Sequence, residues 1–109
     1  MATSTMLKLP SIRKNLSEMK GLLVNDNRRA NHKIRFRKNG DNYTILSQED
    51  KLRSKLEKSF NSFMNELDVK KTGKKLRGLL FIDKNSETFS LGYQNEGEPV
   101  LHQIKGRVG

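Results

Sequence analysis

Two stretches of the chain are strongly basic and contain no acidic residue. They hold eleven of its 22 lysines and arginines: Arg28, Arg29, Lys33, Arg35, Arg37 and Lys38 in the first, and Lys70, Lys71, Lys74, Lys75 and Arg77 in the second. The whole chain has 12 acidic residues and a net charge of +10. Positive charge clustered in this way favours binding to a polyanion such as a nucleic acid.

Within the first stretch, Lys33, Arg35 and Arg37 alternate with Ile34 and Phe36, which predicts a half-buried strand. The three cations then point to one face, about 7 Å apart. That spacing suits the phosphates of an extended strand, and the planar fork of arginine matches phosphate geometry. The alternative is that these charges only keep an exposed strand soluble.

The second basic stretch surrounds Thr72 and Gly73 and follows a predicted helix. A glycine in a lysine-rich loop allows backbone N–H groups to approach an anion closely. The spacing differs from the G-x-x-x-x-G-K-[ST] pattern of a P-loop. The alternative is a solvated connection between a helix and a strand.

Phe81 lies on a predicted strand and shares a face with Leu79 and Arg77. Ser90, Leu101, Gln103 and Lys105 fall on the same predicted face. An aromatic ring among cations on a sheet can stack on the bases of a single-stranded nucleic acid, so Phe81 is a candidate for stacking. The alternatives are a dimer interface and a packing site for the first helix.

The sequence offers little for catalysis or metal binding. It has no cysteine and only two histidines, which lack the HExxH spacing, so we expect no catalytic residue, metal site or cofactor. One acid–base pair is conceivable, between His102 and Glu87 on adjoining strands of a small RNA-cleaving enzyme. We favour a structural role for His102, and we expect His32 to lie near a bound phosphate.

The first part of the chain predicts a short helix. Four apolar residues recur at helical spacing: Ile12, Leu16, Met19 and Leu23. We expect residues 9–23 to form a helix that docks on the rest of the domain. Residues 1–8 are small and polar at their start, and we expect them to be a frayed tail.

A β-hairpin is predicted over residues 32–46. Asn39-Gly40 favours a tight turn because both residues tolerate positive φ. A turn centred there places Phe36 opposite Tyr43. One face of the hairpin is then apolar and the other is basic.

A long helix is predicted over residues 48–67, with Ser47 as its N-cap. Its apolar residues follow helical spacing: Leu52, Leu56, Phe60, Phe63, Met64 and Leu67. We expect Phe60 and Phe63 to lie in the core beneath the sheet.

Residues 76–105 predict a three-stranded meander. Tight turns place Leu80 opposite Phe89, and Phe89 opposite His102. One face would then be apolar, with Leu80, Ile82, Phe89, Leu91, Val100 and Ile104. The long helix can cover that face.

The order α-β-β-α-β-β-β predicts a single α+β domain over residues 1–109, with a mainly antiparallel five-stranded sheet covered by one long amphipathic helix. No apolar run approaches the roughly 20 residues that span a membrane, so we expect no membrane partner. The lack of cysteine and the small size are typical of a cytoplasmic protein of bacterial or viral type.

The leading hypothesis is a non-enzymatic nucleic-acid-binding protein. A single strand of DNA or RNA is favoured over a duplex, because the long helix mixes acidic and basic residues and is a poor groove reader. The alternatives are a small inhibitor or adaptor that docks on an acidic protein, and a small RNase. A homodimer paired through an edge strand, residues 33–37 or 99–105, is also left open.

Overall fold

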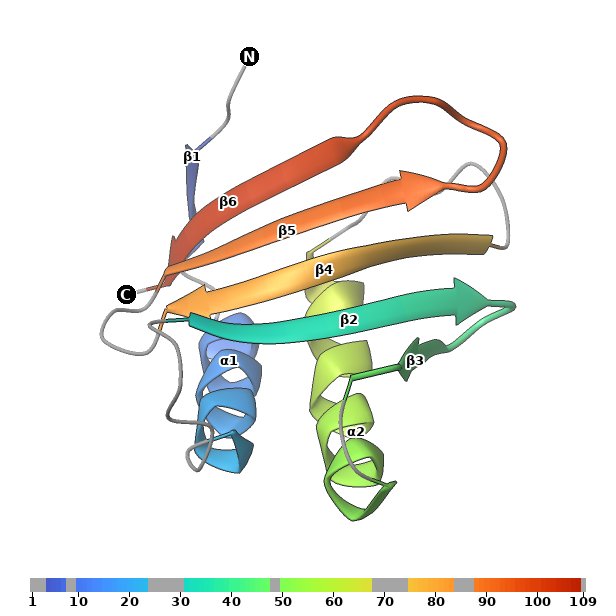
Figure 1. The fold of residues 1–109 in the computed structure, drawn as a ribbon. Helices are drawn as coiled ribbons and strands as arrows, with labels where there is room; N and C mark the ends of the chain where they lie inside the picture. Colours follow the sequence, from blue (N-terminus) through green and yellow to red (C-terminus); the bar gives the residue numbers. More distant parts are fainter. Residues whose placement is uncertain are drawn as a thin grey trace.

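The computed structural model describes residues 4–7, 10–23, 31–47, 50–67, 75–83 and 88–108. The elements follow one another as β1 (Ser4–Leu7), α1 (Pro10–Leu22), β2 (Asn31–Asn39), β3 (Tyr43–Ile45), α2 (Asp50–Glu66), β4 (Lys75–Asp83), β5 (Thr88–Asn95) and β6 (His102–Val108). They form a small α+β domain in which the strands make one sheet (Figure 1).

The sheet has the strand order β1-β6-β5-β4-β2-β3. The five strands β2 to β6 pair in antiparallel fashion, as predicted, and β1 adds a sixth strand parallel to β6. The expectation of a frayed tail over residues 1–8 is therefore wrong for Ser4–Leu7. Without β1, the backbone N–H and C=O groups at the outer edge of β6 would lack partners, and β1 supplies them. The local sequence does not reveal this pairing.

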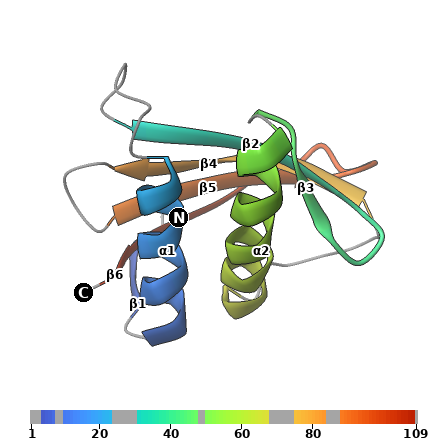
Figure 2. The same cartoon turned by 90° about the horizontal axis from the view of Figure 1, so that it is seen from below.

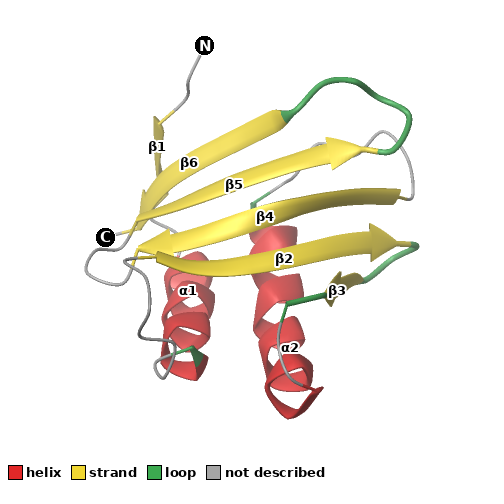
Figure 3. Cartoon of the chain, in the orientation of Figure 1, coloured by secondary structure: helices red, strands yellow, loops and turns green. Residues whose placement is uncertain are grey.

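Both helices lie on the same face of the sheet (Figures 2 and 3). The prediction of one covering helix is wrong in this respect, because α1 packs beside α2 and both helices cover the sheet. Polar bonds join the two helices: Asn15 Nδ2 donates to Ser62 Oγ at 2.9 Å, and Ser59 Oγ donates to Glu18 Oε2 at 2.8 Å. Among the described residues, neither helix is long and apolar enough to cross a lipid bilayer.

The core lies between the helices and the sheet. Phe60 and Phe63 are fully buried, as predicted. The Phe60 ring packs against Phe36, with 4.8 Å between ring centroids, and against Tyr43 at 5.6 Å. Phe63 meets Phe89 edge-on at 5.1 Å. These contacts fix α2 on one face of the sheet, and none of the described elements forms a layer over the opposite face.

The strand registers differ from the predicted ones, although most residues keep their predicted face. Phe36 lies opposite Ile45 rather than Tyr43, and Leu80 lies opposite Leu91 rather than Phe89. Both shifts are of two residues, so the inward and outward sets survive. For β2 and β3 the cause is loop length, because residues 40–42 connect the two strands, with Gly40 at a φ of +94°.

The last two strands are displaced further. His102 lies opposite Tyr93 rather than Phe89, because residues 96–101 form a longer connection than the predicted tight turn. Val100 therefore precedes β6 and is 53% exposed, so its predicted place in the core is wrong. Ile104 does pack against the core.

The edge formed by β3 is closed by side chains of α2. Asn61 Oδ1 accepts from Tyr43 N, and Glu57 Oε2 accepts from Ile45 N, both at 2.8 Å. The strands suggested for edge pairing in a homodimer are only partly covered on their outer sides. On β2, strand β3 pairs with residues 36–38, and on β6, strand β1 pairs with residues 105–108. A homodimer paired through residues 33–37 or 99–105 therefore stays a prediction.

Candidate nucleic-acid interface

The face of the sheet opposite the helices is called the open face here. Its residues come from alternate positions of five strands and include one acidic residue, Asp83 on β4. The others are Lys33, Arg35, Arg37, Thr44, Arg77, Leu79, Phe81, Thr88, Ser90, Gly92, Gln94, Gln103, Lys105 and Arg107. Antiparallel pairing aligns these residues in rows that cross the sheet. One row contains Arg35, Leu79, Gly92 and Gln103, and the next contains Lys33, Phe81, Ser90 and Lys105.

Arginines gather at the side of the open face made by β2 and β4. Arg37 lies directly opposite Arg77, and Arg35 precedes Arg37 by one step on the same face. Among the residues that the structure describes, no acidic side chain forms an ion pair with any of the three. The structure therefore concentrates guanidinium groups where an anion could bridge them.

The backbone of β2 sets how close these arginines come. Arg35 O accepts from Leu46 N at 2.8 Å, and Arg35 N donates to Ser47 Oγ at 3.1 Å, so the backbone polar groups of Arg35 face away from β4. By the two-residue repeat of a strand, those of Arg37 do the same. Arg37 and Arg77 are thus a non-hydrogen-bonded pair, the kind with Cα atoms only about 4.5 Å apart.

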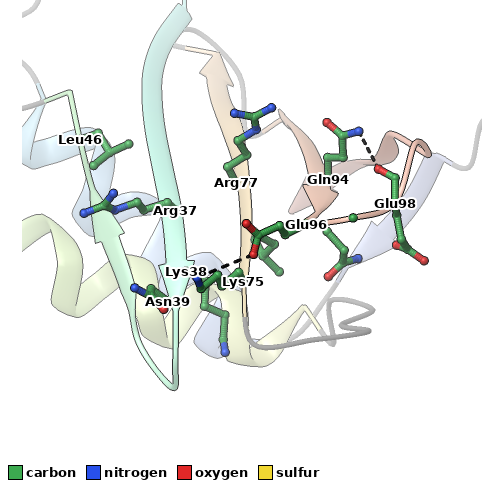
Figure 4. Close-up of a pocket in the computed structure, with 12 residues that line it drawn as sticks. Arg37, Lys38, Asn39, Leu46, Lys75, Arg77, Gln94, Glu96 and Glu98 are labelled. Atoms are coloured by element: carbon green, nitrogen blue, oxygen red, sulfur yellow. Dashed lines mark hydrogen bonds and ion pairs between the residues drawn. The ribbon is translucent and has the colours of Figure 1, made fainter.

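A cavity of about 570 Å³ lies at the end of the sheet beside these arginines (Figure 4). Arg37 and Arg77 line it from neighbouring strands. Lys75, two residues before Arg77 on β4, also lines it, and its Nζ lies 3.9 Å from Glu96 Oε2, with both side chains mostly exposed. An exposed ion pair of this kind contributes little to stability, so Lys75 can exchange Glu96 for another anion.

The predicted basic residues divide into three groups. Lys33, Arg35, Arg37 and Arg77 share the open face, and Lys75 lies exposed at the start of β4. Lys38 does not join them, because it is only 6% exposed and its Nζ donates to Gly40 O above the Tyr43 ring, on the helix side of the sheet. Arg28, Arg29, Lys70, Lys71 and Lys74 lie outside the described residues.

Apolar residues form the middle of the open face. Leu79 and Phe81 project there half-buried, and Leu101 is 62% exposed beside them. The alternative that Phe81 marks a packing site for the first helix is wrong, because α1 lies on the other face (Figure 2). Phe81 thus remains available to a bound ligand or to another protein.

The two histidines lie on the helix side of the sheet. His32 is buried there, so its predicted place beside a phosphate is wrong. His102 stacks on the Tyr93 ring with 4.9 Å between centroids, and its Nε2 lies 3.6 Å from Glu98 Oε1. Glu87, its suggested catalytic partner, lies outside the described residues.

Arg107 is a residue of the open face that sequence reasoning missed. The predicted third strand ends at residue 105, whereas β6 continues to Val108 and places Arg107 opposite Thr88. The continued alternation of Gln103, Lys105 and Arg107 was the signal that could have found it.

No protein-family model, no curated protein and no solved structure matches the chain.

Proposed function

We propose that the protein is a non-enzymatic nucleic-acid-binding module that holds a single strand of DNA or RNA against its open face. The observation that carries the proposal is the cross-strand pair of Arg37 and Arg77, with Arg35 beside it, on the face of the sheet opposite α1 and α2. Guanidinium groups in such a cluster bind phosphates, and the neighbouring apolar residues can receive bases.

A single strand fits this face better than a duplex. Phe81, Leu79 and Leu101 are apolar groups that contact the faces of bases, and a duplex hides those faces within its stack. Duplex readers commonly place a helix in the major groove. Here both helices lie beneath the sheet, and α2 carries Asp50 and Glu57 among its lysines.

An acidic protein partner is the second candidate. Among the described residues, three large apolar side chains are well exposed: Leu46, Val100 and Leu101. Leu46 and Leu101 line the same hollow as Arg35 and Arg77. Apolar anchors with a charged rim are also the anatomy of a protein interface. If this candidate is correct, the protein binds folded acidic proteins. Its affinity for nucleic acids then depends only on their charge.

The two candidates separate in a binding titration of the whole chain with labelled oligothymidylate, oligouridylate, a DNA duplex and heparin. Lys33, Arg35, Arg37 and Arg77 would make four phosphate contacts. The logarithm of the affinity should then fall with the logarithm of the salt concentration with a slope of about −3. We expect the single strands to bind more tightly than the duplex and heparin. Equal affinity for all four polyanions would support the acidic-protein candidate instead.

A further inference from the structure

The middle of the open face contains a hollow of about 480 Å³ that opens to solvent. Its floor is Gly92 on β5, which lies opposite Leu79 of β4 on one side and Gln103 of β6 on the other. Phe81 and Leu101 complete the apolar part of its wall. The volume falls within the range of about 300–1,000 Å³ that is usual for small-ligand sites. We call this feature the Gly92 hollow.

The fold itself gives no reason for a glycine at position 92. A Cβ atom built there meets no atom within 4 Å, and the backbone does not adopt the positive φ that favours glycine. Glycine inside a strand weakens it, because the unfolded chain loses more freedom and no side chain packs. Such a glycine often marks a place where a ligand approaches the backbone closely.

Gly78 on the adjacent strand makes the contrast clear. A Cβ atom at Gly78 would collide with Gly92 O and would lie 2.9 Å from Phe36 Cζ, so packing requires this glycine. Packing therefore requires the glycine at position 78, whereas the described residues leave the space over Gly92 unfilled. This space lies at the bottom of the Gly92 hollow.

We infer that the Gly92 hollow receives one unpaired base of the bound strand, lying over the Gly92 backbone and against Leu79 and Phe81. This inference rests on the proposed function and extends it from phosphate contacts to base contacts. Arg35 lies next to Leu79 in the same row, two strands from Gly92, which puts a cation beside the base for contact with its phosphate. The Gln103 amide can donate or accept a hydrogen bond at the edge of the base.

The test compares an oligothymidylate with an abasic oligonucleotide of equal length and charge, each titrated against the wild-type chain. A base in the hollow predicts that the wild type prefers the base-bearing strand by about 5- to 150-fold, the usual range for one stacked base. Equal affinity for the two would overturn the inference. This comparison needs no variant, so it does not depend on how any mutant folds.

Gly92→Val supplies the second arm. The valine side chain occupies the space directly over the backbone of residue 92, where a base would lie, and valine suits a strand. We therefore expect a melting temperature no lower than that of the wild type. The preference for the base-bearing strand should disappear, whereas the salt slope should stay unchanged because no cation is removed. Thr44→Val, on the same face but outside the hollow, is the matched control and should keep the preference.

The outcomes distinguish this inference from the proposed function. A Gly92→Val protein that keeps the full preference would overturn the base site, even if salt-dependent binding to both strands remains and supports phosphate contacts. A wild-type protein that binds neither oligonucleotide would overturn the proposed function and the base site together.

Discussion

Arg37 of β2 and Arg77 of β4 face each other across two neighbouring strands, in the register position where side chains approach most closely. Like charges directly opposite each other destabilise a sheet. No acidic side chain among the described residues pairs with either guanidinium. The pair therefore lowers the stability of the free protein, and a phosphate bound between the two guanidinium groups would reduce their repulsion.

This relationship predicts that Arg77→Thr stabilises the free protein. Threonine suits a strand, and the substitution ends the repulsion with Arg37, so the free energy of unfolding should rise by about 0.2–1 kcal/mol. Urea denaturation at low salt measures it, and the gain should shrink at 1 M salt, where screening already weakens the repulsion. The same variant should bind single strands more weakly. A loss of stability would show that Arg77 has a structural partner.

Replacing Arg35 and Arg37 together by alanine should remove two phosphate contacts. The slope of log affinity against log salt should flatten by about 1.4, which is 0.7 for each contact to a single strand. The loss should be similar for all base sequences, because phosphate contacts do not read bases. Fluorescence anisotropy over a salt series measures both effects.

The matched control for that variant is Lys55→Ala with Lys58→Ala, which removes the same charge from exposed positions on α2. The helix lies on the opposite side of the sheet from the arginines (Figure 2). We expect this control variant to change the slope of log affinity against log salt much less. If the two double variants behave alike, net charge alone governs binding and the open face is not the site.

The faces of the strands could be predicted from the sequence, whereas their registers could not. Alternation places Ile34 and Phe36 inward and Arg35 and Arg37 outward whatever the pairing partner. Register depends on loop length, and Asn39-Gly40 favoured a two-residue turn where the chain uses residues 40–42. An error of two residues leaves every face unchanged, which explains why the predicted core largely survives.

The candidate site was predictable to the extent that it follows alternation. Lys38 was grouped with the basic cluster by its charge, although its position, two and four residues after Phe36 and Ile34, puts it on the inward face. The pairing of β2 with β4 could not be predicted from the sequence, because it joins residues 31–39 to residues 75–83, which are far apart in the chain. Gly92 carries no local signal either, since only the assembled sheet shows what surrounds it.

Gly78→Ala should destabilise the protein, because the added Cβ would press on the Gly92 backbone and the Phe36 ring. Overpacking of this kind costs about 1–3 kcal/mol. The control is Gly21→Ala in α1, where a Cβ atom meets nothing and the helix should gain about 0.5–1 kcal/mol. Thermal unfolding of the two variants should therefore shift in opposite directions. A neutral Gly78→Ala would mean that β4 and β5 can move apart.

Tyr43 predicts how stability depends on alkaline pH. Burial, with a smaller effect from the nearby Tyr93, raises the pKa of its hydroxyl from 10.0 to about 12. Between pH 10 and 12 the unfolded chain loses this proton while the folded chain keeps it, so ionisation favours unfolding. The free energy of unfolding should be unaffected by Tyr43 below pH 10 and should fall by about 2–3 kcal/mol as the pH rises to 12. Urea denaturation at a series of pH values measures this fall. Tyr43→Phe has no proton to lose, so the decline should be shallower by about that amount, and an equally steep decline in the variant would assign the effect to other groups.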